Sequence, residues 1–493
     1  MNLLLLYPEF PTTFWSFKHA LKFIHKRASL PPLGLLTVAA LVPREWSVRL
    51  VDLNVRSLAP SDLAWADLVC ISAMIAQRDS AEALIGRCRA AGKTIVAGGP
   101  LFTSAQADFP QVDHLVLNEA ELTLPEFLSD FAAGHARHVY ATTRFADIHE
   151  SPPPRWELAN VQRYGSLSVQ FSRGCPFDCE FCDVTAKFGH VPRTKTPAQV
   201  IAELDAIHAT GWRGSVFFVD DNLIGNKRVL KRELLPALIA WQRARGRRFP
   251  FYTEASINLA DDAELMDLMA EAGFDTVFVG IETPDSAALA ECNKRQNQGR
   301  DLVADVKRIQ RSGLQVQGGF IVGFDSDTPS IFRRQVEFIQ KSGIVTAMVG
   351  LLNALPETKL HARLQREGRL VGKTSGNNVD GTINFVPRMS LDRLTEGYRS
   401  ILREIYRPRS YYARVRTFLR EYRRPRAVAP LSWRHGFALA WSSMRLGVLG
   451  RERWQYWRLL TWTLLHRPAQ LQLAVTLAIY GHHFRKCCDA LAV

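Results

Sequence analysis

The sequence has no long apolar run. No stretch of eighteen consecutive apolar residues occurs in its 493 residues, whereas a helix that crosses a bilayer needs about 20 of them. Residues 1–7 lack a basic region and are too short to serve as a secretory signal. We therefore expect a cytoplasmic protein without a transmembrane helix.

Cysteine is scarce and shows no framework spacing. Five of the eight cysteines are scattered: Cys70, Cys88, Cys292, Cys487 and Cys488. A small secreted domain would instead carry regularly spaced cysteines for disulfides. A disulfide-stapled fold is therefore excluded, and the other three cysteines, which lie within eight residues, need a different explanation.

Excess charge is absent from most of the chain. Residues 401–493 contain 17 Lys and Arg against 4 Asp and Glu, a net +13 of the total +14. The first 400 residues contain 45 basic and 44 acidic residues and are nearly neutral. The basic character therefore belongs to a C-terminal segment.

Three thiols converge in residues 172–182, where Cys175, Cys179 and Cys182 have the spacing C-x3-C-x2-C. Thiolates this close suit a soft metal centre. The set is one cysteine short of a four-thiolate iron–sulfur site, and three ligands on a cubane leave one iron open. A tetrahedral zinc site is the alternative; it needs a fourth ligand, for which His190 is the only candidate in the next ten residues.

Residues 1–140 alternate apolar runs with helical stretches, which predicts a doubly wound (Rossmann-like) parallel sheet. The expected strands are 3–7, 48–52, 68–72, 94–97 and 114–117. Ligands of such sheets bind at the carboxyl ends of the strands. The candidate residues there are Ser72, Gly98, Gly99, Glu119 and Glu121. Each could equally mark only a tight turn.

Residues 166–360 resume the alternation, with strands expected at 168–171, 215–219, 250–254, 276–280, 315–322 and 345–351. Six βα units predict a partial (β/α)6 TIM-type barrel with its chemistry at the carboxyl-terminal rim. Candidate residues at the strand ends are Asp220, Asp221, Glu254, Glu282, Gly319, Ile321 and Gly323. The alternative for each carboxylate is a capped strand end or an ion pair.

A stiff, proline-rich linker at residues 151–156 divides these two regions. We expect three domains: residues 1–150, a barrel at 160–370, and a mainly helical, basic domain at 380–493.

The pattern C-x3-C-x-aromatic-C, with Phe181 directly before Cys182, resembles the signature of the radical S-adenosylmethionine (SAM) enzymes. The resemblance implies a [4Fe-4S] cluster on Cys175, Cys179 and Cys182 as the catalytic centre, with SAM on the open iron. It also implies an external electron donor of the flavodoxin or ferredoxin type.

The same resemblance assigns SAM contacts at the strand ends. Glu254 and Glu282 stand where family members contact the ribose or methionyl group. Asp220 and Asp221 replace a G-G-E-like motif whose glycines are missing. Gly319, Ile321 and Gly323 match the G-x-I-x-G adenine motif without its trailing Glu, and Phe181 lies beside the cluster.

Residues 1–140 resemble the cobalamin-binding domain that precedes many radical SAM barrels. The resemblance lies in residues 31–34, 51–54 and 98–100 and in the acidic turn that contains Glu119 and Glu121. The implied cobalamin contacts are Ser72, Gly98, Gly99 and Glu119. The D-x-H-x-x-G motif that supplies an axial ligand elsewhere is absent, and its nearest counterpart ends in Pro152. Radical SAM relatives commonly lack this His, so cobalamin is still expected, without a named axial ligand.

Residues 179–183, 192–197, 219–222 and 479–486 resemble the branch related to the hopanoid C-2 methylase. The implied reaction is methyl transfer to an unactivated carbon of a lipid or other natural product. One SAM starts hydrogen removal, methylcobalamin supplies the methyl group, and a second SAM replenishes it. Two alternatives stay open: rearrangement or cyclisation without methyl transfer, and a non-catalytic cobalamin or cluster sensor.

The basic segment beyond residue 407 is interleaved with Trp433, Trp441, Trp454, Trp457 and Trp462. Such a pattern can mark an interfacial surface on anionic lipid, nucleic-acid contact, or only a solvated basic face. No zinc-finger, helix-turn-helix or RNA-recognition motif is present. We therefore expect peripheral contact with the inner face of the membrane, and no nucleic-acid partner.

Overall fold

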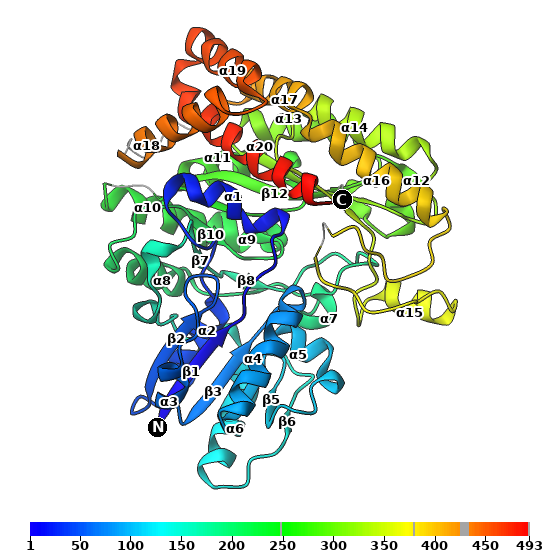
Figure 1. The fold of residues 1–493 in the computed structure, drawn as a ribbon. Helices are drawn as coiled ribbons and strands as arrows, with labels where there is room; N and C mark the ends of the chain where they lie inside the picture. Colours follow the sequence, from blue (N-terminus) through cyan, green and yellow to red (C-terminus); the bar gives the residue numbers. More distant parts are fainter. Residues whose placement is uncertain (247–248, 378–379, 424–432, 492–493) are drawn as a thin grey trace.

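The computed structural model describes residues 1–246, 249–377, 380–423 and 433–491. The lower part of Figure 1 is a six-stranded parallel sheet with the order β2-β1-β3-β4-β5-β6. Its strands are β1 (Asn2–Tyr7), β2 (Ser47–Asp52), β3 (Leu68–Ser72), β4 (Thr94–Gly98), β5 (His114–Val116) and β6 (Val139–Tyr140). The five predicted strands are confirmed to within one residue at each end, and β6 adds an edge.

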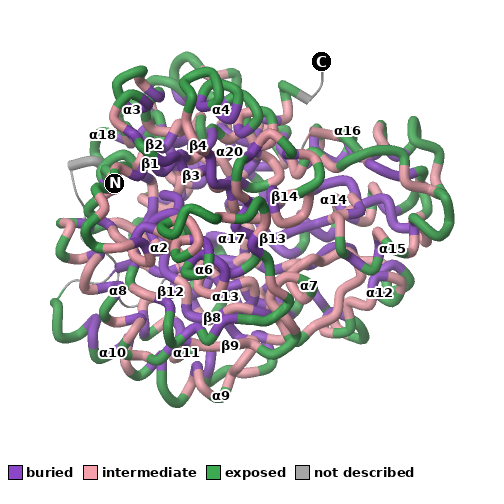
Figure 2. Tube along the Cα trace, turned by 90° about the horizontal axis from the view of Figure 1, so that it is seen from below, coloured by how far each residue is buried: buried purple, intermediate pink, exposed green. Residues whose placement is uncertain are grey.

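Helices cover both faces of this sheet, which explains why its strands are apolar on both sides. Along β1, Leu3 and Leu5 pack in the core beneath α2 (Leu33–Leu41) and α6 (Ala120–Ala132). Leu4 and Leu6 pack in the opposite core. The helices of that side are α3 (Pro60–Trp65), α4 (Arg78–Ala90) and α5 (Pro100–Ser104). Figure 2 shows buried backbone along β1, β3 and β4 beneath the exposed outer surfaces of α3 and α4.

The second sheet is also parallel, with the order β14-β13-β12-β11-β10-β7. Its strands are β7 (Leu167–Val169), β10 (Val216–Phe218), β11 (Phe251–Glu254), β12 (Phe274–Glu282), β13 (Gln315–Val322) and β14 (Ala347–Leu351). Helices that follow these strands are α8 (Pro197–Ala209), α11 (Ala263–Ala272), α12 (Ser286–Glu291), α13 (Leu302–Arg311), α14 (Ser330–Ser342) and α15 (Lys359–Arg366). The six-unit partial barrel is thus confirmed.

The helical segment that follows β10, residues 227–244, is interrupted. It consists of α9 (Lys227–Val229), a π-helical turn (Leu230–Leu234) and α10 (Leu235–Ala244). Pro236 has no backbone N–H to donate to the carbonyl of Arg232, so the regular ladder cannot continue there.

The C-terminal helices extend the barrel core instead of forming a separate body. They are α16 (Leu391–Tyr406), α17 (Pro408–Glu421), α18 (Trp433–Ser442), a π-helical turn η12 (Ser443–Val448), α19 (Arg453–His466) and α20 (Leu471–Leu491). Buried Arg414 of α17 donates hydrogen bonds to the carbonyls of Ile405 and Val345, and the Tyr406 hydroxyl donates to Ala347 in β14 at 2.6 Å. Among the described helices, none is both long and apolar enough to cross a bilayer.

Residues 14–24 depart from the unit expected at 1–150. They leave the first sheet as three short helices, η1 (Phe14–Ser16), α1 (Lys18–Leu21) and η2 (Lys22–Ile24). η1 and α1 pack on α20, and η2 packs on α18. The ring of Phe14 stacks on Phe484 with centroids 4.1 Å apart, and His483 Nε2 lies 2.9 Å from the Phe14 carbonyl oxygen. The two ends of the sequence are therefore held together by an aromatic contact that no local pattern could predict.

Candidate active site

The cysteine loop, residues 174–183, lies between β8 (Ser172–Arg173) and α7 (Val184–Phe188). β8 pairs antiparallel with β9 (Arg193–Thr194), which brings the segment after the loop back across it. Gly174 has φ +98°, and a Cβ there would lie 2.9 Å from the carbonyl oxygen of Gly189 and 3.0 Å from that of Val191. Only glycine fits this crossing.

The three thiols are partly buried and receive polar contacts. Asn222 Nδ2 lies 3.9 Å from the sulfur of Cys175, and Gln296 Nε2 lies 3.7 Å from the sulfur of Cys179. Burial raises the pKa of the Cys175 thiol and raises that of Cys182 to about 12. These two thiols are therefore protonated when free, and a bound metal centre would hold them as thiolates.

The donor set fits a cluster better than a single ion. Within the described residues, no three His, Cys, Asp or Glu side chains are gathered as ligands to one metal ion. The thiolates of a cubane each bind a different iron, so they stand farther apart than ligands of a mononuclear site. The zinc alternative, with His190 as fourth ligand, requires a tight tetrahedron that these residues do not form.

Asp220 supports the cysteine loop from below. It is completely buried and accepts hydrogen bonds from the backbone of Phe171 and Ser172, and from Ser172 Oγ at 2.6 Å. Burial nevertheless raises its pKa to about 7. Asp220 thus positions the segment that leads into the cysteine loop, because the hydrogen bonds it accepts come from Phe171 and Ser172. Its contact with SAM stays a prediction.

Asp221 and Glu254 form a half-buried acidic pair that no ion pair of the described residues neutralises, although the charges of Lys187 and Lys294 lower their pKa values in part. Burial and the neighbouring Asp183 charge raise the pKa of Asp221 to about 6. Burial and the charges of Asp221 and Asp220 raise the pKa of Glu254 to about 8. Carboxylates held this close in a low dielectric are stabilised when a cationic ligand comes between them.

Glu282 ends β12 with φ +61° and is already paired. Its Oε1 lies 2.6 Å from Lys294 Nζ, which also lies 5.8 Å from the centre of the Phe181 ring. Burial by itself lowers the pKa of Lys294, but the charges of Glu282 and Cys179 raise it above its ordinary value. Lys294 therefore adds a fixed cation beside the cysteine loop. Sequence reasoning missed it, since no motif contains it.

The G-x-I-x-G segment lies at the carboxyl end of β13, as predicted. Its glycines are needed because neighbouring side chains or the backbone conformation leave no room for a Cβ. A Cβ on Gly319 would lie 2.7 Å from the ring of Phe278. Gly323 has φ +109°, and its N–H donates to Asp327 at 2.8 Å. Ile321 and Phe181 both pack against one small apolar cluster and form an apolar wall next to the loop.

The carboxyl ends of β3 and β4 bring together the residues expected to contact cobalamin. Gly99 has φ +89°, and a Cβ there would lie 2.6 Å from Ser72 Oγ. A Cβ on Gly98 would lie 2.6 Å from the backbone oxygen of Val116 in β5. This edge is therefore shaped by close backbone approach, which suits a large flat ligand.

Glu119 faces the barrel and not this edge. Its Oε1 lies 2.7 Å from Arg173 Nη1, and Arg193 contacts the same carboxylate at 3.1 Å. Glu121 Oε1 lies 2.7 Å from Arg173 Nη2. Burial raises the pKa of Glu121, but the hydrogen bond and charge of Arg173 outweigh it and lower that pKa to about 2.

These four side chains form a clamp between the first sheet and the cysteine loop, which adjoin in Figure 1. The oxygens of Glu119 are occupied by Arg173, Arg193 and the N–H of Ala146, so this side chain serves the clamp. Its contact with cobalamin stays a prediction. The sequence offered one signal: Arg173 directly precedes Gly174 and Cys175.

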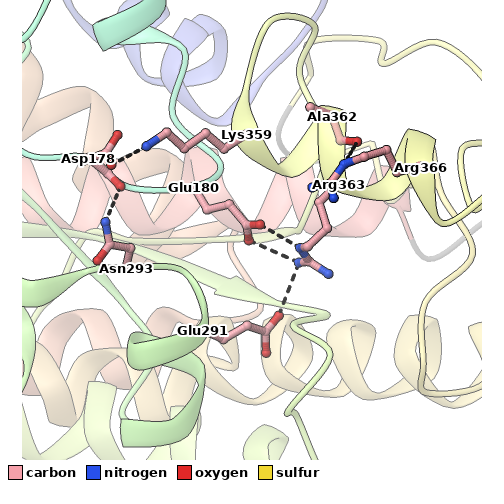
Figure 3. Close-up of a pocket in the computed structure, with 8 residues that line it drawn as sticks. All are labelled: Asp178, Glu180, Glu291, Asn293, Lys359, Ala362, Arg363 and Arg366. Atoms are coloured by element: carbon pink, nitrogen blue, oxygen red, sulfur yellow. Dashed lines mark hydrogen bonds and ion pairs between the residues drawn. The ribbon is translucent and has the colours of Figure 1, made fainter.

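A polar pocket on the outer side of the cysteine loop is shown in Figure 3. Arg363 of α15 binds Glu180 through two hydrogen bonds of 2.6 and 3.1 Å, and Lys359 pairs with Asp178. Asn293 donates to the Asp178 carbonyl at 2.8 Å. Because its charges neutralise one another, the pocket serves to fasten α15 to the loop.

Comparison with known proteins agrees with this geometry. Residues 25–128 match the B12 binding domain, residues 169–358 match the radical SAM superfamily, and residues 358–492 match a domain of unknown function (DUF4070). The chain is 42% identical to an uncharacterized methyltransferase of Synechocystis (sll1242), over 98% of this chain and 91% of that protein. It is 37% identical to the hopanoid C-2 methylase of Rhodopseudomonas palustris, over 84% of this chain and 78% of that protein.

The fold is similar to the solved structure of TsrM, a radical SAM methyltransferase from Kitasatospora setae with cobalamin and a [4Fe-4S] cluster bound. The TM-score is 0.63 at 14% identity, with both chains fully covered. Cysteine loop, acidic pair and glycine edge fit the cofactors that the resemblance implied, namely a [4Fe-4S] cluster, SAM and cobalamin. The methyltransferase relatives argue against a non-catalytic sensor. The chain belongs to the cobalamin-dependent radical SAM C-methyltransferases.

Proposed function

We propose that the protein methylates an unactivated carbon of a polycyclic lipid of the hopanoid type. The observation that carries the proposal is the 37% identity with the hopanoid C-2 methylase, which extends over the cobalamin-binding, barrel and C-terminal regions. An sp3 carbon has no lone pair with which to attack SAM directly, so such a substrate requires radical chemistry.

The cofactors, when bound, supply hydrogen abstraction and the methyl group, while the chain's own residues bind, orient and exclude water. Cys175, Cys179 and Cys182 would hold the cluster. Asp221 and Glu254 would accept the ammonium of SAM, which would restore charge balance to a half-buried acidic pair.

The apolar wall of Phe181 and Ile321 would shield the reacting atoms from water. The clamp keeps the first sheet against the cysteine loop. We further infer that electrons come from an external donor of the flavodoxin or ferredoxin type, because the described chain offers one cysteine loop and no second cluster motif.

The test compares untargeted lipid profiles of a deletion strain and its parent, and then assays the reconstituted protein on the lipid that changes. The product should be heavier by one methylene unit, and the Cys175→Ala variant should give none. Cleavage of SAM with a product of unchanged mass would favour the rearrangement alternative.

A further inference from the structure

The outer surface of α18, η12 and α19 collects exposed apolar side chains. In the described part of the chain, seventeen large apolar side chains are exposed, and ten of them lie between residues 437 and 465. Leu465, Trp454 and Leu449 are the most exposed of these, at 80%, 77% and 74%. We call this surface the α18–α19 face; it lies at the end of the molecule remote from the first sheet (Figure 1).

The α18–α19 face is rigid, because the same helices bury their other side. Tyr456 and Leu459 of α19 are fully buried in the core that α17 and α20 share. The indole N–H of Trp457 donates to the Gly447 carbonyl at 2.9 Å, which ties α19 to η12. The apolar side chains are thus held outward on a packed scaffold.

Positive charge surrounds these side chains. Arg445, Arg451, Arg453 and Arg458 are exposed on the same segment. Glu452 is the one acidic residue between positions 433 and 467, and it is buried against Arg485 at 2.6 Å. No carboxylate of the segment is therefore left to neutralise the exposed arginines.

The neighbouring helix α17 adds to this charge. Burial and the charges of Arg458 and Arg420 lower the pKa of Arg416, whose Nη1 is buried without a hydrogen-bond partner. The guanidinium of Arg420 lies 5.3 Å from the centre of the Trp462 ring. Arginines crowded this way favour an anionic partner.

We propose that the α18–α19 face docks on an anionic lipid bilayer, with Leu449, Trp454 and Leu465 entering the interface and the arginines meeting the headgroups. Apolar and aromatic side chains rimmed by basic residues are the chemistry of interfacial binding. A second copy of the chain fits less well, because a twofold contact would bring the arginines of both copies together. The inference does not depend on the proposed substrate, although it would bring the enzyme to a lipid.

The test is flotation of the full-length protein with substrate-free vesicles. Vesicles of equal parts phosphatidylglycerol and phosphatidylcholine should bind the protein at low salt, and high salt should release most of it. Pure phosphatidylcholine vesicles should bind at least about tenfold less. Brominated lipid in the anionic vesicles should quench tryptophan fluorescence, and Trp454→Phe should reduce that quenching.

Variants separate the two contributions. Arg453→Glu with Arg458→Glu should weaken binding to anionic vesicles at least about tenfold, and Trp454→Ser with Leu465→Ser should abolish the quenching. The matched control, Leu391→Ser with Arg399→Glu, changes exposed residues of α16 and should bind like the wild type. Iron content and circular dichroism report folding, and the arginine variant, which alters only exposed side chains, keeps the test valid if the apolar variant misfolds.

Three outcomes would overturn the inference: wild-type protein that ignores anionic vesicles at low salt, equal binding to neutral vesicles, or control variants that lose binding as strongly. A lipid-free dimer that Trp454→Ser dissociates would assign the face to self-association. Failure of methylation alone would leave this inference standing, since no substrate is used.

Discussion

The carboxylates at the edges of the two sheets differ in whether a basic side chain of the protein neutralises their charge. At the first sheet, Glu119 and Glu121 face Arg173 and Arg193, and the pKa of Glu121 falls to about 2. At the second sheet, Asp221 and Glu254 have raised pKa values of about 6 and 8. Acids that the protein neutralises itself hold the structure together, whereas the two half-buried acids of the second sheet form no ion pair within the described residues and therefore favour a cationic ligand.

The largest loss of activity is expected from changes in the cysteine loop, which lies between the edge of the first sheet and the edge of the second. Replacing Cys175, Cys179 or Cys182 with Ala should abolish the cluster absorbance and all SAM cleavage, because each of the three thiolates would hold one iron of the cluster. The control is Cys292→Ala, whose buried thiol contacts the Leu289 carbonyl; it should retain iron. A triple-Ala variant that still holds four irons would refute the assignment.

The edge of the first sheet can be damaged without changing any charge. Gly98→Val would push a side chain into the Val116 backbone oxygen, so cobalamin content should fall severalfold while iron content is preserved. Gly86→Ala in α4, where a Cβ meets open space, should leave both contents unchanged. Cobalt and iron analysis of the purified variants measures both contents. A cobalamin content of Gly98→Val equal to that of the wild type would show that this edge does not bind cobalamin.

The acids of the second sheet are tested by removing one charge. Glu254→Gln keeps the shape of the side chain but loses a charged partner for SAM, so SAM affinity should fall about ten- to hundredfold. Glu121→Gln, which alters an ion-paired acid, should leave SAM affinity unchanged. Equilibrium dialysis under anaerobic conditions measures the SAM affinity of both variants. Similar SAM affinities for Glu254→Gln and the wild type would show that Glu254 does not bind SAM.

For the ion-paired acids of the first sheet we expect an effect on stability and none on SAM affinity. Glu121→Gln should destabilise the protein by about 1–3 kcal/mol at neutral pH. The ordinary pKa of 4.5 falls to about 2 in the folded protein, so the stabilisation is complete above pH 4.5 and is lost as the pH falls toward 2. The variant should therefore show a flatter stability profile over that range in urea unfolding. Its ratio of methylated product to 5′-deoxyadenosine should also drop, because the clamp positions the two sheets.

A smaller effect is expected on stability from Glu254. The pKa of Glu254 is raised from 4.5 to about 8, so its burial costs stability progressively as the pH rises through that interval. In protein without SAM, Glu254→Gln should be more stable than wild type at pH 8 and above, by about 1 kcal/mol or more, and equal to it below pH 4.5. Denaturant midpoints that move in parallel at every pH would contradict this.

The strands could be predicted from apolar periodicity and the cysteine loop from its spacing, because each depends on residues that are close together in the sequence. The strand at 315–322 and the C-x3-C-x2-C loop depend on residues within a few positions of one another. The clamp could not be predicted, since Glu119 and Arg173 are 54 positions apart and meet only after both sheets form. The same holds for Phe14 on Phe484. The motifs also assigned Asp220 and Glu119 to cofactors, but they could not show the contacts that both residues make within the protein.

Truncation illustrates the same limit. The basic segment cannot be removed near Arg407 without loss to the barrel, because α17 begins at Pro408 and contributes buried Tyr411, Arg414 and Phe418 to the barrel core. Surface variants on α19 therefore probe the basic segment without disturbing the active site.

The most direct test of the account is a single turnover of protein loaded with cobalamin that carries a trideuterated methyl group, in the presence of unlabelled SAM and the lipid substrate. If the clamp brings the edge of the first sheet to the cysteine loop so that cobalamin is the immediate donor, the product should carry the trideuterated methyl group, and 5′-deoxyadenosine should form in equal amount. A product with an unlabelled methyl group, or SAM cleavage with no methylated product, would contradict the account.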